Sequence, residues 1–132
     1  MNPSQPPLPA RRVLIVEDLE DCLETMVALI STRGCDVRVA RDGKSAVAMA
    51  QSFLPHVILL DLGLPVMNGF EAATRIRADA RLQHCIIVAV SGHGMQSDKE
   101  RSAQAGVDLH LIKPVSFEDL SRLLEDPGIG KP

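Results

Sequence analysis

The sequence predicts an α/β fold, a doubly wound parallel sheet of five strands that alternate with five helices. Short apolar runs of strand length alternate along the chain with segments whose apolar residues recur at helical spacing. The central runs, such as Val13–Val16 and Val57–Leu60, are apolar on both faces, which is typical of parallel strands buried between two layers of helices. Since crossovers between parallel strands are right-handed, helices are expected on both faces of the sheet. A chain of 132 residues is long enough for one such domain and its core.

The predicted strands are short and rich in Val, Ile and Leu, as strands commonly are. Most of them are followed directly by a polar or charged residue, which marks the end of the buried run. The expected strands are 13–16, 37–39, 57–60, 86–90 and 109–112.

The predicted helices begin and end at residues that favour helix boundaries. Asp42 can cap the second helix, the Ser97-x-x-Glu100 pattern starts the fourth, and Ser116-x-x-Asp119 opens the last. The expected helices are 19–30, 42–53, 69–77, 97–106 and 116–124. The residues expected to face the sheet include Leu19, Cys22, Leu23, Met26, Val27 and Ile30 in the first helix, and Phe117, Leu120, Leu123 and Leu124 in the last.

The two ends of the chain differ from its middle in composition. Residues 1–11 contain four prolines and little to bury, so we expect a disordered or extended leader. Residues 126–132 cannot continue a helix and are expected to form a flexible tail. The folded domain is therefore predicted over residues 12–125, with no internal linker or repeat.

The composition excludes several classes of function. A net charge of −3 argues against a nucleic-acid binder, and no apolar run approaches the roughly 20 residues of a membrane span. Aromatic residues make up 2% of the chain, with no Tyr or Trp, so a site that stacks bases or sugars is not expected. The 3 cysteines lack metal or disulfide spacing, which favours reduced thiols in a cytoplasmic protein.

Polar side chains follow four of the predicted strands and are expected to meet at one edge of a parallel sheet. Glu17 and Asp18 follow the first strand, and Asp61 closes the third. Ser91 closes the fourth strand and Lys113 the fifth. Carboxylates so close together repel, and a hard cation such as Mg²⁺ relieves that repulsion. A cation site, a lysine and a hydroxyl around a carboxylate suit phosphoryl transfer, which favours Asp61 as an aspartyl-phosphate acceptor.

Four segments together resemble the receiver domain of two-component response regulators, chemotaxis regulators included. The segments are VLIVED at 13–18, LLDLGLPVMNGFE at 59–71, VAVSG at 88–92 and HLIKP at 110–114. Their style is closest to the receivers of hybrid histidine kinases. The resemblance covers residues 12–125 and implies a flavodoxin-like sheet with strand order 2-1-3-4-5. It implies a signalling domain rather than an enzyme with a substrate of its own, although such a domain can catalyse its own phosphorylation and dephosphorylation.

The resemblance also assigns a role to individual residues. Asp61 would accept a phosphoryl group from a histidine kinase or a histidine phosphotransfer protein, while Ser91 and Lys113 would bind its oxygens. Mg²⁺ would be held by Asp18 directly, by Glu17 through water, by Asp61 and by the carbonyl of Gly63. The remaining matches are Pro65 and Gly69 in the loop after the acceptor, and Pro114, where the family often has a cis Lys-Pro bond.

Two positions depart from the commonest pattern of the family. His110 occupies the switch position, which is usually Tyr or Phe, and Ser91, which shares the switch role, stands where Thr is also common. The resemblance places the surface for a downstream protein partner on the fourth helix, fifth strand and fifth helix. Gly63 and His93 occupy positions that vary within the family.

Two other functions fit the sequence less well than a phosphorylated receiver does. A receiver-like adapter that binds proteins without phosphorylation is disfavoured because the acidic pair, Asp61, Ser91 and Lys113 are all present. A flavin-binding domain of similar topology would need Trp or Tyr, which the chain lacks. The Gly43-Lys44-Ser45 triplet lacks the earlier glycine of a phosphate-binding loop and indicates an ordinary helix start.

Overall fold

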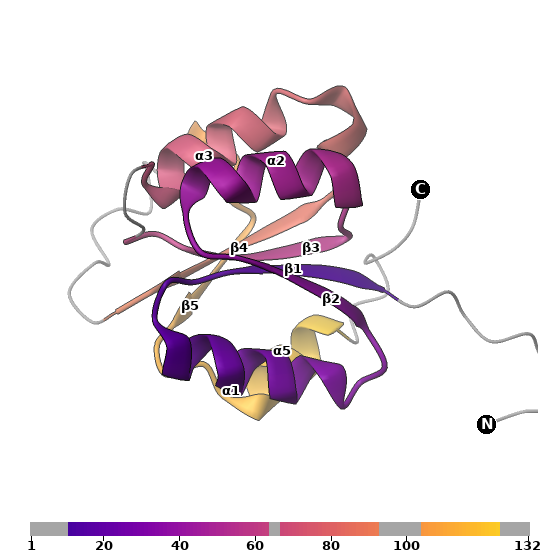
Figure 1. The fold of residues 1–132 in the computed structure, drawn as a ribbon, viewed down its shortest axis with the longest axis vertical. Coiled ribbons are helices and arrows are strands. Elements are labelled where there is room, and N and C mark those ends of the chain that lie inside the picture. Colours follow the sequence, from indigo (N-terminus) through magenta and orange to yellow (C-terminus); the bar gives the residue numbers. More distant parts are fainter. Residues whose placement is uncertain (1–10, 64–66, 93–103, 125–132) are drawn as a thin grey trace, which may run out of the picture.

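A five-stranded parallel sheet forms the centre of the computed structural model, which describes residues 11–63, 67–92 and 104–124. The strand order is β2-β1-β3-β4-β5, as the resemblance implied. Figure 1 shows α1 and α5 on one face of the sheet and α2 and α3 on the other. The strands are β1 (Arg12–Val16), β2 (Asp36–Ala40), β3 (Val57–Asp61), β4 (Ile86–Ser91) and β5 (Leu109–Ile112).

Four α-helices lie within the described residues: α1 (Glu20–Ser31), α2 (Gly43–Phe53), α3 (Gly69–Arg77) and α5 (Phe117–Leu124). The helix predicted over 97–106 begins outside the described residues, and its last part is seen as helical Gln104 and Ala105. A short 3₁₀ turn, Ala80–Leu82, was not predicted. The predicted leader and tail also lie outside the described residues, apart from Arg11. No described helix combines the length and the apolar character that crossing a bilayer requires.

The predicted helix caps are present where their residues are described. The Asp42 side chain accepts a hydrogen bond from the Ser45 amide at 2.7 Å, and the Ser116 hydroxyl accepts one from the Asp119 amide at 3.0 Å. Each bond satisfies one of the amides that a helix start leaves without an intrahelical partner.

Two hydrophobic cores fill the two faces of the sheet, because successive strand residues point to opposite sides. Leu14, Ile58 and Ile87 pack beneath α2 and α3, while Ile15 and Leu59 pack beneath α1 and α5. All five of these side chains are at most 1% exposed. The prediction that the central strands are covered on both faces is therefore confirmed.

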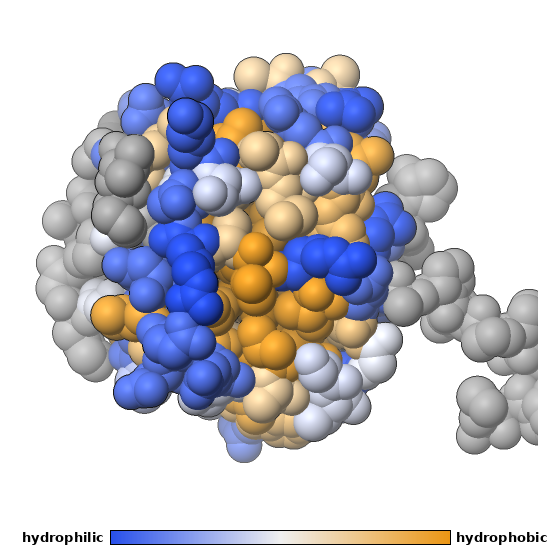
Figure 2. Space-filling view, in the orientation of Figure 1, coloured by the Kyte–Doolittle hydropathy of each residue, from blue (hydrophilic) through white to orange (hydrophobic). Residues whose placement is uncertain are grey.

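The two edge strands are more exposed than the predicted pattern implied. Leu109 and Ile112 of β5 are 45% and 39% exposed, and Val39 of β2 is 38% exposed. Figure 2 shows an apolar strip between charged side chains on the face that carries the β2 edge. A strand at the edge of a sheet has a neighbour on one side only, so its apolar residues are less completely covered.

Two residues predicted to face the sheet are instead exposed to solvent. Leu19 is 55% exposed and directly precedes α1, and Phe117 is 48% exposed as the first residue of α5. The α5 stripe that does pack against the sheet consists of Leu120, Leu123 and Leu124. Helical periodicity gives the direction of a side chain, but it does not tell where the neighbouring layer ends.

Candidate functional site

The polar residues at the carboxyl ends of the strands lie at one edge of the sheet, named here the carboxyl edge. Glu17 and Asp18 follow β1, Asp61 ends β3, Ser91 ends β4, and Lys113 follows β5. In Figure 1 this edge lies at the left of the sheet. Because all pairings are parallel, residues far apart in the sequence are brought together here, as predicted.

Lys113 joins two of the carboxylates at the centre of this edge. Its ammonium Nζ donates to Glu17 Oε1 at 2.7 Å and to Asp61 Oδ2 at 3.3 Å. The Glu17 side chain is fully buried and that of Asp61 is 10% exposed. Such charge-assisted bonds, shielded from water, are stronger than ion pairs on the surface.

The acidic groups outnumber this lysine. One ligand oxygen from each of Glu17, Asp18 and Asp61 lies within 4.8 Å of the others, a spacing at which three carboxylates can hold a metal ion. The other oxygen of Glu17, Oε2, is buried and has no hydrogen-bond partner. A buried carboxylate oxygen without a partner is costly, and a cation at this point would remove that cost.

The two buried carboxyl groups respond in opposite ways to their surroundings. Burial, together with the neighbouring Asp61 carboxylate, raises the pKa of Glu17 to about 7 despite the bond from Lys113. Burial alone would raise the pKa of Asp61 as well, but the neighbouring Glu17 carboxyl group, the bond from the Gly63 amide and the Lys113 ammonium lower it. In the same way, the two carboxylates outweigh burial and raise the pKa of Lys113. The pair therefore keeps its proton on Glu17 and leaves Asp61 ionised.

The loop after Asp61 is held close to it by backbone contacts. The Gly63 amide donates to Asp61 Oδ1 at 2.9 Å. A Cβ atom on Gly69 would lie 2.7 Å from both the Asp61 carbonyl oxygen and Leu62 Cα, so only glycine fits there. Gly43 at the start of α2 is just as restricted, because its Cβ would lie 2.2 Å from the Met67 carbonyl oxygen. The predicted loop residue Pro65 lies outside the described residues.

The other side of the site is built by β4 and β5. Ser91 is buried at the end of β4, and its carbonyl accepts a hydrogen bond from the Lys113 amide at 2.8 Å. The bond between Lys113 and Pro114 is cis, as the resemblance implied. His110 lies inside β5 opposite Ala89, and its Nε2 atom is buried without a partner. His93 lies outside the described residues.

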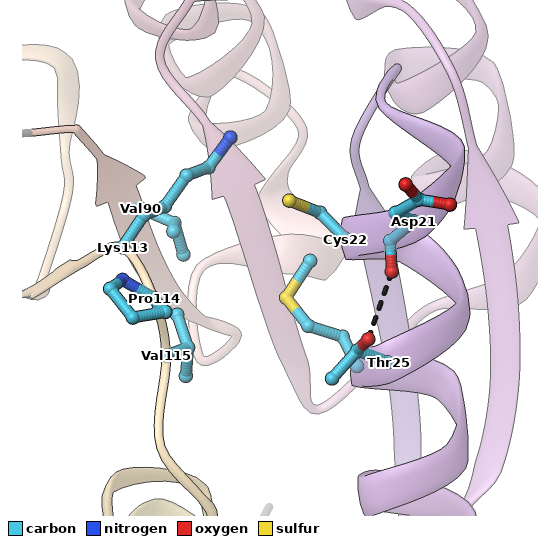
Figure 3. A pocket seen from close by; sticks show the side chains of 8 residues that line it. Asp21, Cys22, Thr25, Val90, Lys113, Pro114 and Val115 are labelled. Carbon is cyan, nitrogen blue, oxygen red and sulfur yellow. Dashed lines mark hydrogen bonds between the residues drawn. The ribbon is translucent and has the colours of Figure 1, made fainter.

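A cavity beside the site was not predicted from the sequence. It has a volume of about 210 Å³ and lies between α1 and the connection from β5 to α5 (Figure 3). Cys22, which was expected in the core, is half-buried and lines this cavity, and burial with the nearby Glu17 carboxylate raises the pKa of its thiol. No pattern of residue types predicts a gap between two packed elements. The lining residues are Asp21, Cys22, Thr25, Met26, Val90, Lys113, Pro114 and Val115.

Comparisons with known proteins agree on one family. The family model described as "Response regulator receiver domain" matches residues 13–125. The polar-differentiation response regulator DivK of Brucella ovis is 33% identical, over 80% of this chain and 86% of that protein. The hybrid signal transduction histidine kinase I of Dictyostelium discoideum is 34% identical over 80% of this chain, but the match spans only 6% of that kinase.

Solved structures show the same relationship. The receiver domain of the sensor histidine kinase PA1611 from Pseudomonas aeruginosa, which has a magnesium ion in its active-site cleft, gives a TM-score of 0.80 at 32% identity. The match covers 88% of this chain and 95% of that one. A chain in the co-crystal structure of the Saccharomyces cerevisiae phosphotransfer protein Ypd1 with the Ssk1 receiver domain gives 0.79 at 30% identity, covering 87% of this chain and 86% of that one.

Proposed function

This chain belongs to the response regulator receiver domain family, which acts in two-component and phosphorelay signalling, and from that premise we propose that Asp61 is its phosphoryl acceptor. The donor is the phosphohistidine of a histidine kinase or of a histidine phosphotransfer protein. One observation carries this proposal. The ionised and largely buried Asp61 accepts from the Gly63 amide through one oxygen and from Lys113 through the other, and it lies within 4.8 Å of two more carboxylates.

The same residues fit a bound Mg²⁺ ion. Glu17, Asp18 and Asp61 would supply carboxylate oxygens, and the buried Glu17 Oε2, which has no partner, is an oxygen that a cation would satisfy. The Gly63 carbonyl would supply a fourth oxygen, as the family resemblance implies. When bound, Mg²⁺ supplies positive charge that offsets the charge on the phosphoryl oxygens.

Asp61 acts as the nucleophile in the proposed reaction. A carboxylate oxygen of Asp61 attacks phosphorus, and the bond from phosphorus to the donor imidazole nitrogen breaks. The electron pair returns to that nitrogen, and the donor imidazole takes up one proton from water. The product is an aspartyl phosphate on Asp61 and an unmodified donor histidine.

Lys113 and Ser91 act on the phosphoryl group rather than on the donor. Lys113 exchanges one of its present carboxylate partners for a phosphoryl oxygen, and the Ser91 hydroxyl donates to another. Autodephosphorylation would use the same residues, with water attacking the phosphorus of the aspartyl phosphate.

Incubation with a small phosphodonor and Mg²⁺, followed by intact mass measurement, tests the proposal. We expect wild type and the control Asp36→Asn, a half-exposed acid on β2, to gain one phosphoryl group, whereas Asp61→Asn gains none. If wild type gains no phosphoryl group and calorimetry detects no Mg²⁺ binding, the chain is instead a receiver-fold adapter that works without phosphorylation.

Exposed apolar residues support a downstream partner surface on β5 and α5 together with the predicted fourth helix. Leu109 and Ile112 of β5 and Phe117 of α5 are each at least 39% exposed. His110 lies between the first two in the same strand, which suits the switch role implied for it together with Ser91. A shift in the population of two conformations would connect phosphorylation to this surface. A cytoplasmic location is part of this proposal, because the proposed phosphoryl donors act there.

A further inference from the structure

His56 joins three strands at the opposite end of the sheet, named here the amino edge. It directly precedes β3, and its amide donates to the Arg12 carbonyl of β1 at 2.8 Å. Its own carbonyl accepts from the Ile86 amide of β4 at 2.9 Å. The backbone of this single residue therefore connects β3 to both of its neighbours where all three strands begin.

The His56 side chain adds a bond that depends on its protonation state. The Arg12 amide donates to His56 Nδ1 at 2.9 Å. That bond requires a lone pair on Nδ1, so the imidazole is neutral and carries its proton on Nε2. The Arg12 side chain holds the preceding connection in place, because its Nε donates to the carbonyls of Phe53 and Leu54 at 3.1 and 2.9 Å.

The charges around His56 oppose its protonation. Half-burial of the ring, followed by the nearby Arg12 and Arg11 guanidinium groups, lowers the pKa of His56 below its ordinary value of 6.5. On the β4 side, Cys85 directly precedes the strand, and burial raises the pKa of its thiol to about 12, so it is uncharged at neutral pH. No carboxylate among the described residues acts on His56 strongly enough to reverse this effect.

We propose that His56 is a pH-sensitive latch that fastens the start of β1 to the start of β3, closed while the imidazole is neutral and open when it is protonated. Protonation places an N–H group on Nδ1, opposite the N–H group of Arg12, so two donors face each other and neither has an acceptor. Because the protonated form is favoured in the unfolded chain, the stability contributed by the latch is complete above about pH 6.5 and is lost as the pH falls below it. The latch lies at the other end of the sheet from Asp61, so it does not depend on the proposed function.

Nuclear magnetic resonance of the four histidine side chains tests the protonation state directly in the wild-type protein. Long-range proton–nitrogen spectra between about pH 8 and pH 5 distinguish the two tautomers and follow the titration of each ring. We expect His56 to be protonated on Nε2 at high pH and to titrate at a lower pH than histidines of the same chain unfolded in urea. A proton on Nδ1 at high pH, or a midpoint at or above that of the unfolded chain, would overturn the proposal.

Urea unfolding as a function of pH tests the consequence for stability. The matched variant is His56→Asn, whose side-chain oxygen can accept from the Arg12 amide but does not titrate. The control is His84→Asn, an exposed histidine in the connection before β4. As the pH falls from about 7 to about 5, we expect the unfolding midpoint of His56→Asn to rise relative to that of wild type and of the control, because only those two proteins lose the bond to His56. Equal changes of midpoint in all three proteins would contradict the latch. Other titrating groups, Glu17 among them, contribute alike to the three proteins and cancel in this comparison.

Discussion

The carboxyl edge and the amino edge are the two ends of the same strands, but their polar side chains differ in the partners that they bond. At the carboxyl edge, three carboxylates approach within 4.8 Å, and a buried oxygen of Glu17 has no partner. At the amino edge, arginines and His56 bond mainly to backbone atoms, and Arg12 alone donates to two carbonyls. A buried carboxylate oxygen without a partner at one edge indicates a site for a ligand. The bonds from described side chains to the backbone at the other edge indicate a structural role.

A second arginine extends this contrast. Arg77 at the end of α3 donates to the carbonyls of Gly106 and Leu82 at 2.9 and 3.0 Å and pairs with Asp108. Asp108 in turn accepts from the Ile87 amide at 2.8 Å. Arg77 thus holds together the chain segments that enter β4 and β5. Side-chain bonds to the backbone therefore fix β4 and β5 where they begin. The proposed functional residues lie at the opposite ends of the strands.

The largest effect on activity is expected from Lys113→Ala. Removing this ammonium should slow phosphoryl uptake by about 100-fold or more, since one group that stabilises developing charge is typically worth that much. Mg²⁺ should bind at least as tightly, because Lys113 competes with it for the carboxylates. Timed intact mass measurements and calorimetry check the two parts.

Lys44→Ala, a change to an exposed lysine of α2, serves as the control for Lys113→Ala and should leave both quantities unchanged. Phosphoryl uptake by Lys113→Ala within about threefold of wild type would show that the lysine only neutralises buried charge.

The largest effect on stability is expected at the amino edge, from Arg77→Ala. Losing its bonds and leaving Asp108 without its cation should lower the free energy of unfolding by about 2–4 kcal/mol. The Mg²⁺ dissociation constant should stay within about threefold of wild type. Urea unfolding followed by far-ultraviolet circular dichroism suits a chain without Trp or Tyr.

Arg75→Ala is the matched control for Arg77→Ala, because the pair that Arg75 forms with Glu71 on the same helix, at 3.5 Å, is exposed. Such a pair contributes about 0.5 kcal/mol or less. Equal losses in the two variants would mean that Arg77 is no more than another surface charge.

The contrast between the edges also explains what the sequence could predict. The strand order follows from the family resemblance, and the meeting of Glu17, Asp61 and Lys113 follows from parallel strands that end together. The amino edge has no such signal, because its bonds run from side chains to backbone atoms, and any residue type supplies a carbonyl. For this reason the sequence alone assigns no role to His56. The exposure of Phe117 and the cavity beside Cys22 depend on where packed layers end, which periodicity does not encode.

Binding of Mg²⁺ should depend on pH because Glu17 must give up its proton. Burial raises the pKa of Glu17 from 4.5 to about 7, so its effect on stability is favourable below about pH 4.5 and is lost as the pH rises through about 7. Mg²⁺ binds the ionised form, and its affinity should therefore increase by up to about tenfold per pH unit below pH 7 and level off above it.

Calorimetry between about pH 6 and pH 8 measures this dependence, and buffers with different ionisation enthalpies report the proton released. Glu17→Gln, which cannot titrate, should bind Mg²⁺ more weakly and lack the dependence on pH. A wild-type affinity that does not change across this range would place the proton elsewhere than on Glu17.

The smallest effect on Mg²⁺ binding is expected from Asp42→Ala. This variant tests why one acidic residue at the carboxyl edge belongs to the metal site and another does not. Asp42 follows β2 as Asp18 follows β1, but its two oxygens already accept from the amide and the hydroxyl of Ser45 at 2.7 and 3.2 Å. These bonds, led by the one from the Ser45 amide, lower the pKa of Asp42. Removing its side chain should therefore cost only the stability of a helix cap, and the Mg²⁺ dissociation constant should stay within about twofold of wild type.

The matched change Asp18→Ala should weaken Mg²⁺ binding by at least about tenfold, although both residues follow a strand at the same edge. Calorimetry on the two variants shows whether a carboxylate binds Mg²⁺ because of its position at this edge or because its oxygens have no protein partner. If Asp42→Ala weakened Mg²⁺ binding as much as Asp18→Ala, the net charge of this edge would matter more than which carboxylates remain without protein partners. If only Asp18→Ala does so, a carboxylate is available to the metal because the chain has left its oxygens unused.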